Sequence, residues 1–244
     1  MADAPKSDFL SFITAVARIL HLSDLHGHRG HYQWLLSEVH QHRFALDAIA
    51  LSGDLISDLG TDLTLNAEAK LVSELLLQLP EDIPLVIADG NHDFTADDNH
   101  GETPRWIRQL HRQNLSRPPD VVVIDGVAIA SVGWGNFPKH SADFYVIHAP
   151  PAFARTAAGV ERQDFGDLDL ADHLQNFGGT ALCGHVHQPQ KWYDLRNGRR
   201  SLNPGISEPE APTPNHIIID TQAGTATRYV HGQHPHPIRL RSEM

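Results

Sequence analysis

Cysteine is nearly absent from this sequence, which limits what can hold the fold together. Cys183 is the single cysteine among 244 residues. An intrachain disulfide is therefore excluded, which fits a reducing compartment, and we expect a cytoplasmic protein. With 41% hydrophobic residues the chain can bury a sizeable core, and we expect one domain over residues 1–244.

Positive charge is also scarce. The chain carries 19 Lys and Arg against 30 Asp and Glu, which gives a formal net charge of -11 with histidine neutral. Proteins that bind long nucleic acids usually present a basic surface, so this balance disfavours a nucleic-acid partner without excluding one. Metal ions in a pocket can still bind a phosphate group, because they reverse the local field.

Long apolar runs are missing as well. No segment approaches the roughly 20 apolar residues that a membrane-spanning helix needs, and we expect no membrane association. Residues 9–17 form a short apolar stretch that ends in Ala-Val-Ala, like a signal-peptide cleavage site. Asp3 and Asp8 precede this stretch and only Lys6 opposes them, so the basic leader of a signal peptide is lacking and we expect no export.

The first half of the chain alternates short apolar runs with helical patterns. The apolar runs predict buried strands over residues 18–24, 48–54 and 85–88. The helical patterns cover residues 31–44 and 65–79, and Pro80 ends the second. Alternation of this kind indicates right-handed crossovers and a largely parallel sheet.

The second half is richer in hairpin signals. Asp-Gly at 125–126, Asn-Gly at 197–198 and Ala-Gly at 223–224 each separate two apolar segments. Further patterns predict a strand over 144–147 and helices over 105–115 and 167–177. We therefore expect two mixed sheets packed together with helices outside. The core should span about residues 18–230, with a peripheral N-terminal segment and a mobile, Pro/His-rich tail from His231.

Five short motifs contain side chains that commonly bind metal ions. They are Asp24-Leu25-His26, Gly53-Asp54, Gly90-Asn91-His92-Asp93, His148 and Gly184-His185-Val186-His187. Their carboxylates, imidazoles and carboxamide suit borderline divalent cations. Each motif follows a predicted strand, and open α/β sheets keep their chemistry at strand ends.

Each motif also has an ordinary explanation when taken alone. Asp24 and Asp54 could cap turns, Asn91 could belong to a polar turn, and His148 could be a hydrogen-bonded histidine at the edge of the core. The pair of imidazoles two residues apart after Gly184 is the most specific signal. Because all five motifs come in order at strand ends, we interpret them together as a metal site. Cys183 is interpreted as a small core residue.

Read together, these motifs resemble those of the calcineurin-like metallophosphoesterase superfamily, over residues 18–205. The resemblance implies an α/β fold with four layers, an α/β/β/α sandwich of two mixed β-sheets flanked by helices. It also implies a centre of two divalent metal ions. Its first ion would be bound by Asp24, His26, Asp54 and His187. Its second ion would be bound by Asp54, Asn91, His148 and His185, so that Asp54 bridges the two.

The resemblance further assigns chemical roles. A water or hydroxide between the ions would attack the phosphorus, and His92 would protonate the leaving oxygen. The ligand set accepts manganese, iron or zinc, so the identity of the metal stays open. The residue that orients His92 is open too, with Asp58 and Asp93 as candidates.

The sequence departs from the protein phosphatases of that family, which extend Gly-Asp to Gly-Asp-x-x-Asp-Arg-Gly. Here Asp58 comes one residue late and the arginine is missing. That arginine would clamp a phosphomonoester, so its absence favours a phosphodiesterase that acts on a small phosphate ester such as a cyclic nucleotide. A nuclease, a small-molecule phosphomonoesterase and a non-catalytic scaffold remain alternatives, although the complete ligand set disfavours the scaffold.

Two polar loops, over residues 94–104 and 133–142, are expected to rim the pocket. Loops often carry specificity. We therefore hypothesise that a substrate base or sugar contacts residues from the set His100, Trp134, Asn136 and Phe137. No pattern in the sequence predicts the oligomeric state.

Overall fold

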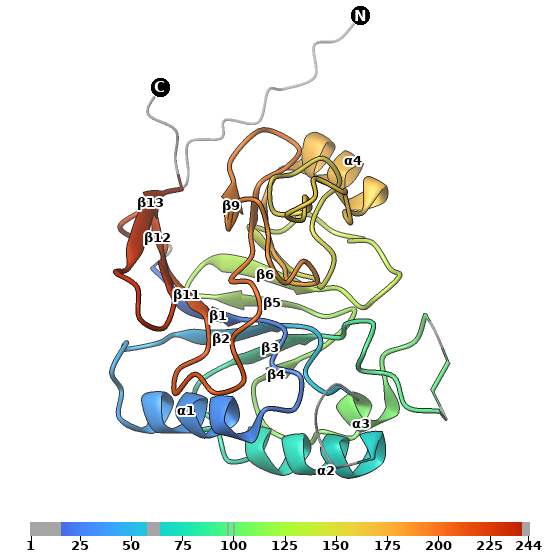
Figure 1. Cartoon of the computed structure of the whole chain (residues 1–244), viewed down its shortest axis with the longest axis vertical. Helices are drawn as coiled ribbons and strands as arrows, with labels where there is room; N and C mark the ends of the chain where they lie inside the picture. Colours follow the sequence, from blue (N-terminus) through green and yellow to red (C-terminus); the bar gives the residue numbers. More distant parts are fainter. Residues whose placement is uncertain (1–15, 58–63, 97, 100, 241–244) are drawn as a thin grey trace, which may run out of the picture.

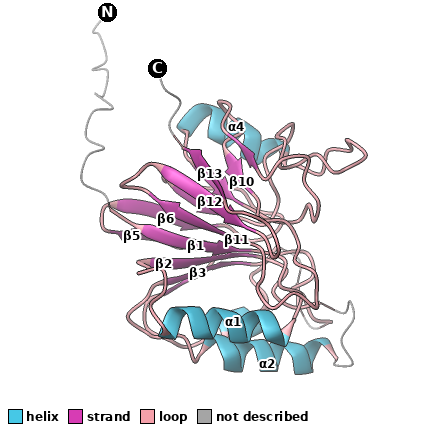
Figure 2. Cartoon of the chain, turned by 60° about the vertical axis from the view of Figure 1, so that its left-hand side comes forward, coloured by secondary structure: helices cyan, strands magenta, loops and turns pink. Residues whose placement is uncertain are grey.

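Two β-sheets packed face to face form the centre of the part of the chain that this computed structural model describes (Figure 1). The described residues are 16–57, 64–96, 98–99 and 101–240. Helices cover the outer face of each sheet, with α1 and α2 below one and α4 above the other (Figure 2). The four-layer α/β/β/α arrangement is therefore confirmed.

Four helices are present in the described part of the chain, and a polar side chain caps the start of two of them, α2 and α4. Their bounds are α1 Arg29–His40, α2 Leu65–Leu76, α3 Arg105–Arg108 and α4 Leu168–Phe177. The Thr64 hydroxyl accepts a hydrogen bond from the backbone N–H of Ala67, and the Asp167 carboxylate accepts one from Leu170. Such caps satisfy N–H groups that the first turn leaves free. Because of these caps, α2 and α4 begin close to the residues predicted from the sequence.

The larger sheet contains both early parallel strands and late antiparallel ones. In the described part of the chain its order is β13-β12-β11-β1-β2-β3-β4. The bounds are β1 Arg18–Leu22, β2 Ala48–Ser52, β3 Leu85–Ala88, β4 Leu115–Ser116, β11 His216–Asp220, β12 Thr225–Tyr229 and β13 His236–Arg239. Leu22 of β1 pairs with Leu51 of β2 in parallel register, so both strands end at the same edge.

The smaller sheet has its strands in the order β5-β6-β7-β8-β10-β9 within the described residues. The bounds are β5 Val121–Ile124, β6 Val127–Ser131, β7 Phe144–Val146, β8 Thr180–Leu182, β9 Tyr193–Asp194 and β10 Ser201–Leu202. Val146 pairs with Leu182 in parallel, so β7 and β8 also end level. The three hairpins predicted at residues 125–126, 197–198 and 223–224 are confirmed.

Successive side chains of the central strands point to opposite faces of the sheet and therefore pack in different layers. Ile19 packs between the two sheets, whereas Leu20 and Leu22 pack against α1 and α2. This follows from the two-residue period of a strand. It explains why the strand sequences are continuous apolar runs, as expected for strands buried on both faces.

The helix predicted over residues 105–115 is wrong in extent, because α3 ends at Arg108. Arg117 donates hydrogen bonds to the carbonyls of Ile107 and Leu110, and Arg112 donates to the carbonyl of Ile83. The bonds from Arg117 satisfy carbonyls that a longer helix would have satisfied internally, whereas the bond from Arg112 ties the chain after α3 to the segment before β3. The chain then turns through Asn114, whose φ is 52°, and enters β4.

The expectation of a mobile tail from His231 is also wrong. Strand β13 pairs with β12, with Ile238 opposite Ala226, and Leu240 is buried in the core between the sheets. Pro237 is tolerated because β13 is an edge strand, where a missing N–H leaves no partner unpaired. The core therefore extends past residue 230.

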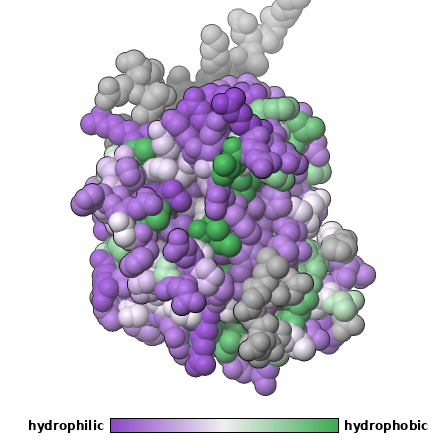
Figure 3. Space-filling model, in the orientation of Figure 1, coloured by the Kyte–Doolittle hydropathy of each residue, from purple (hydrophilic) through white to green (hydrophobic). Residues whose placement is uncertain are grey.

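Three earlier expectations concern residues outside the described ranges: the stretch 9–15, Asp58 and His100. Among the residues that are described, every helix is too short or too polar to cross a bilayer. Most of the face seen in Figure 3 is hydrophilic, which agrees with the charged composition.

Candidate metal centre

All seven predicted ligands lie at one edge of the sandwich, where parallel strands of both sheets end. Strands β1, β2 and β3 lead to Asp24 and His26, Asp54, and Asn91, respectively. In the smaller sheet, β7 leads to His148 and β8 leads to His185 and His187. The structure therefore brings together the side chains that the sequence motifs selected.

The backbone at these strand ends is held in an unusual conformation. Asp24, His26, Asp54 and His185 all have positive φ, at 53°, 44°, 51° and 66°. Non-glycine residues adopt this left-handed region rarely, and they do so at functional sites when the surroundings enforce it. Here the Asp24 N–H donates to the Gly53 carbonyl over 3.1 Å, and the His26 N–H donates to the Asp54 carbonyl over 2.9 Å. The two ligand loops thus fix each other.

Two glycines allow the loops to approach closely. A Cβ atom on Gly184 would lie 2.3 Å from Asp24 Oδ2, and one on Gly90 would lie 2.3 Å from Asp54 Oδ1. Both distances are far below contact distance. The glycines are therefore required by the close approach of the carboxylates, not only by turn geometry.

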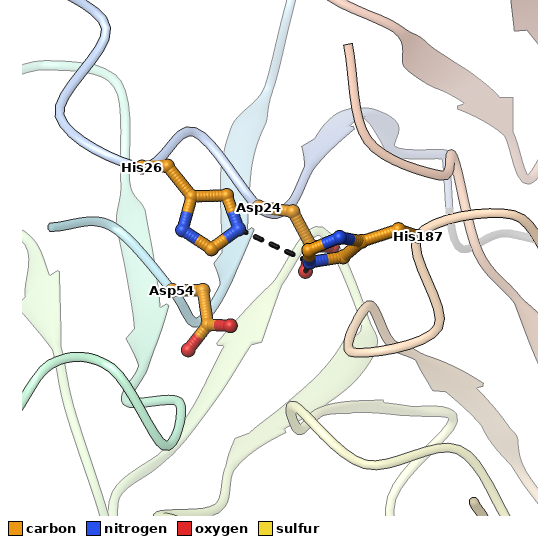
Figure 4. A group of neighbouring side chains, drawn as sticks. All are labelled: Asp24, His26, Asp54 and His187. Atoms are coloured by element: carbon orange, nitrogen blue, oxygen red, sulfur yellow. Dashed lines mark hydrogen bonds and ion pairs between the residues drawn. The ribbon is translucent and has the colours of Figure 1, made fainter. Parts of the chain in front are cut away.

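The first predicted ligand group forms a compact cluster (Figure 4). One donor atom from each of Asp24, His26, Asp54 and His187 lies within 4.8 Å of the others. The Nε2 atoms of His26 and His187 are 3.2 Å apart, and His187 Nε2 is 3.5 Å from Asp24 Oδ1. Two donors bound about 2.1 Å from one ion lie roughly 3.0–3.4 Å apart. The spacing therefore fits a single cation.

The second predicted group consists of two close pairs. His148 Nε2 is 3.1 Å from Asp54 Oδ2, and His185 Nδ1 is 3.0 Å from Asn91 Oδ1. His148 Nδ1 lies 2.8 Å from the Ser52 carbonyl, which can only accept, so Nδ1 carries the proton and Nε2 faces Asp54. A ring nitrogen fixed by a carbonyl in this way is typical of metal-binding histidines.

The charge states also suit cation binding. Burial lowers the pKa of His26 and of His185 to about 4, so both imidazoles are neutral at pH 7 and keep a lone pair for a metal. Burial raises the pKa of Asp24, and its Oδ2 atom has no hydrogen-bond partner among the described residues. Burial opposes ionisation of Asp54, but the Asp54 carboxylate and the His148 imidazole stabilise each other's charged forms, which lowers the pKa of Asp54 and, against the effect of burial, raises the pKa of His148 to about 9. A buried acceptor such as Asp24 Oδ2 is satisfied by a bound cation.

His92 lies beside the cluster and is partly exposed. Its backbone N–H donates to Asp54 Oδ1 over 2.9 Å, and its ring centroid is 5.6 Å from that of His26. The imidazole therefore lies next to the first ligand group and is partly accessible to solvent.

Of the two open candidates for orienting His92, Asp93 is directed elsewhere. One Asp93 oxygen accepts hydrogen bonds from the N–H groups of Leu55 and Ile56, and the other accepts from Gly90. Asp93 is fully buried and ties the loop after β2 to the loop after β3. It supports the backbone of two ligand loops and is not directed at the imidazole.

Comparison with known proteins decides the family. The family model described as calcineurin-like phosphoesterase matches residues 17–189. The chain belongs to this family. No match is found among curated proteins.

The chain is also similar to solved structures. The TT1561 protein of Thermus thermophilus is 16% identical, with a TM-score of 0.52 over 93% of this chain and 100% of that one. The phosphoesterase Yfce of E. coli is 17% identical, with a TM-score of 0.48 over 92% of this chain and 100% of that one. At 16% identity, the similarity to the TT1561 protein shows a shared fold and nothing beyond it.

Two residues near the candidate metal centre were not predicted from the sequence. Asp89 is buried, and its Oδ2 accepts the backbone N–H of Trp134 over 2.9 Å. Burial raises the pKa of Asp89 to about 6. Its place at the end of β3, directly before the Gly90 turn, was a signal that could have been used. Phe165 lies near His185 and has no comparable signal in the sequence.

Proposed function

We propose that this protein is a metal-dependent phosphoesterase with two divalent ions, and that it prefers small phosphodiesters. The observation that carries the proposal is the convergence of seven donor side chains from both sheets, with neighbouring donor atoms 3.0–3.5 Å apart. Asp54 contacts both ligand groups, which supports its role as the bridge.

When bound, two such cations lower the pKa of a water molecule and neutralise phosphate oxygens. The chain itself supplies orientation and proton transfer. The ligand loops hold the donors before any ion binds, because backbone hydrogen bonds fix them. His92 is placed to give a proton to the leaving oxygen, a step that contributes typically 10²–10⁴-fold in rate.

The preference for diesters rests on the side chains around the donors. The side chains whose rings lie near the rings of the ligand histidines include His92, Trp134 and Phe165. None of these three carries a permanent positive charge. A monoester carries more negative charge than a diester and benefits more from an arginine clamp. The Gly53-Asp54 motif lacks the arginine that would supply one.

The test is hydrolysis of bis-p-nitrophenyl phosphate and p-nitrophenyl phosphate with manganese, iron or zinc. We expect a higher kcat/KM for the diester and about two metal ions per chain by elemental analysis. A His92→Gln variant should lose about 10²–10⁴-fold in kcat while its metal content stays unchanged. His40→Gln, at an exposed position of α1, is the matched control.

Each outcome bears on a separate part of the proposal. A preference for the monoester would contradict the diester assignment. No hydrolysis of either ester with any of the metals would contradict the enzymatic role, and equal kcat in wild type and His92→Gln would remove His92 from the mechanism.

A further inference from the structure

A small hollow opens beside His148, on the side of the centre formed by the second ligand group. Its volume is about 160 Å³, and its walls are the loop 133–136 after β6 and the segments at 147–149 and Asp167. We call this hollow the Trp134 slot, after the largest side chain in its lining. His148, a candidate ligand of the second ion, is part of the lining, so the slot lies against the proposed metal centre.

Aromatic rings stand at the junction of the slot and the centre. The Trp134 ring centroid is 5.6 Å from that of His148 and 5.2 Å from that of His185. The Phe165 ring lies 6.4 Å from His185 and is 44% exposed. Two large rings therefore flank the imidazoles on the solvent side.

The backbone that carries these two rings is held in place without a ligand. The Trp134 backbone N–H donates to the buried carboxylate of Asp89. The Phe165 N–H donates to the Ala157 carbonyl over 3.0 Å, and Asp167 exchanges backbone hydrogen bonds with Pro150 and Ala152, both over 2.8 Å. A binding surface fixed in advance loses little conformational entropy when it is occupied.

The size and the polar groups of the slot indicate what it can hold. A cavity of roughly 150 Å³ accommodates one benzene-sized ring. Asn136 adds a carboxamide to the lining, and Asp167 adds a carboxylate that uses one oxygen to cap α4. The slot thus offers an aromatic face together with hydrogen-bonding groups, which suits a flat ring with polar edges.

We propose that the Trp134 slot binds a heteroaromatic ring of the substrate, so that the natural ester is a nucleotide-type phosphodiester. This inference rests on the proposed function, because the phosphate must lie at the metal centre while the ring stacks on Trp134. Stacking of a base on an aromatic side chain commonly strengthens binding by about tenfold or more.

The experiment compares two diesters with the same leaving group. They are thymidine 5′-(p-nitrophenyl) phosphate and methyl p-nitrophenyl phosphate, both tested on the manganese-loaded protein. We expect kcat/KM of the wild type to be at least about tenfold higher for the thymidine ester. Trp134→Leu should lose this ratio and Trp134→Phe should keep most of it, because only the second variant retains an aromatic face.

Phe177→Ala is the matched control, since this exposed phenylalanine ends α4 and packs on His173. It should leave the ratio unchanged. Equal kcat/KM for the two esters in the wild type, or an unchanged ratio in Trp134→Leu, would overturn the inference. If both esters are hydrolysed with equal kcat/KM, the slot is rejected but the proposed phosphoesterase function is still supported.

A second readout does not depend on turnover. Calorimetric titration compares thymidine 5′-monophosphate with methyl phosphate on the wild type and on both Trp134 variants. Binding at least about tenfold tighter for the nucleotide, lost in Trp134→Leu but kept in Trp134→Phe, supports the slot. Equal binding of the two phosphates overturns it. Failure to hydrolyse either ester would count against the proposed function only.

Discussion

Asp93 shows how a single side chain can serve the backbone of a site without touching its chemistry. It follows His92 in the sequence, yet its two oxygens accept three backbone N–H groups from two ligand loops. Loops that would otherwise carry unsatisfied donors in a buried place are stabilised by such a carboxylate. The position of the ligands therefore depends on a residue that does not bind the metal.

An Asp93→Asn variant tests this role. The amide keeps one accepting oxygen but presents an NH₂ group to one of the backbone donors, so a buried N–H is left unpaired. We expect the free energy of unfolding to fall by about 1–3 kcal/mol, measured by urea denaturation. Asp125→Asn, at an exposed hairpin turn, should change it by less than about 0.5 kcal/mol. Equal effects of the two substitutions would contradict the assigned role.

His216 makes stability depend on pH. It is buried against Trp34 and stacks on Tyr229 with ring centroids 4.8 Å apart. Burial lowers its pKa from 6.5 to about 4. The unfolded chain therefore binds this proton more readily than the folded protein does. Its stabilising contribution is complete above pH 6.5 and is lost as the pH falls towards 4.

We expect His216 to account for about 2 kcal/mol of the stability lost between pH 7.5 and pH 5. His216→Phe keeps the aromatic stack and removes the titrating group. Urea denaturation at the two pH values should show a smaller loss in the variant by about that amount. A loss of the same size in both proteins would show that His216 does not titrate in this range.

At the scale of elements, the ligand loops are shaped by close backbone contacts. Gly184 follows β8, and its Cα faces the carboxylate of Asp24 after β1. A methyl group there would displace Asp24 from the first ligand group. Changes next to metal ligands typically weaken metal affinity by about 10–100-fold.

Gly184→Ala should therefore weaken manganese binding by about 10–100-fold in a calorimetric titration. Gly30→Ala is the matched control, because a Cβ on this α1 glycine meets no heavy atom within 4 Å. It should bind manganese as the wild type does and be slightly more stable, since alanine favours a helix. Unchanged affinity in Gly184→Ala would show that the Asp24 loop can shift without loss of the site.

The central strands, three of the helices and the convergence of the seven candidate ligands could be predicted because their signals are local. Apolar runs mark the strands, and donors such as Asp54 and His148 follow directly on them. Strand β13 and the short α3 could not be predicted in this way. They depend on partners distant in sequence, such as β12 for Ile238 and the carbonyl of Ile83 for Arg112. The same holds for Trp134, which is placed by Asp89 through a loop of no regular pattern.

At the scale of the whole molecule, the donors join the two sheets. Asp24, Asp54 and Asn91 follow strands of the larger sheet, whereas His148 and His185 follow strands of the smaller one. Ions bound between them would link the sheets at one edge. A ligand that binds only the folded state stabilises it by an amount that grows with the logarithm of its concentration above the Kd.

Metal binding should therefore raise Tm. At a free manganese concentration of about 100 times Kd, the gain is about 2.7 kcal/mol, or roughly 5–10 °C for a domain of this size. Differential scanning calorimetry of chelated and manganese-loaded protein measures it. A variant that carries both Asp24→Asn and Asp54→Asn lacks two carboxylate ligands and should show little of this rise in Tm. Equal Tm of the wild type with and without manganese would contradict a metal link between the sheets.

Strand β1 lies between β2 and β11, and Ile19 pairs with Ile219. During synthesis, β1, β2 and β3 leave the ribosome well before β11, so β1 keeps one edge without hydrogen-bond partners until β11 has been made. Open strand edges promote association between nascent chains. Completion of the larger sheet therefore waits for β11, and chaperones that shield an exposed strand edge should matter most before that strand is available.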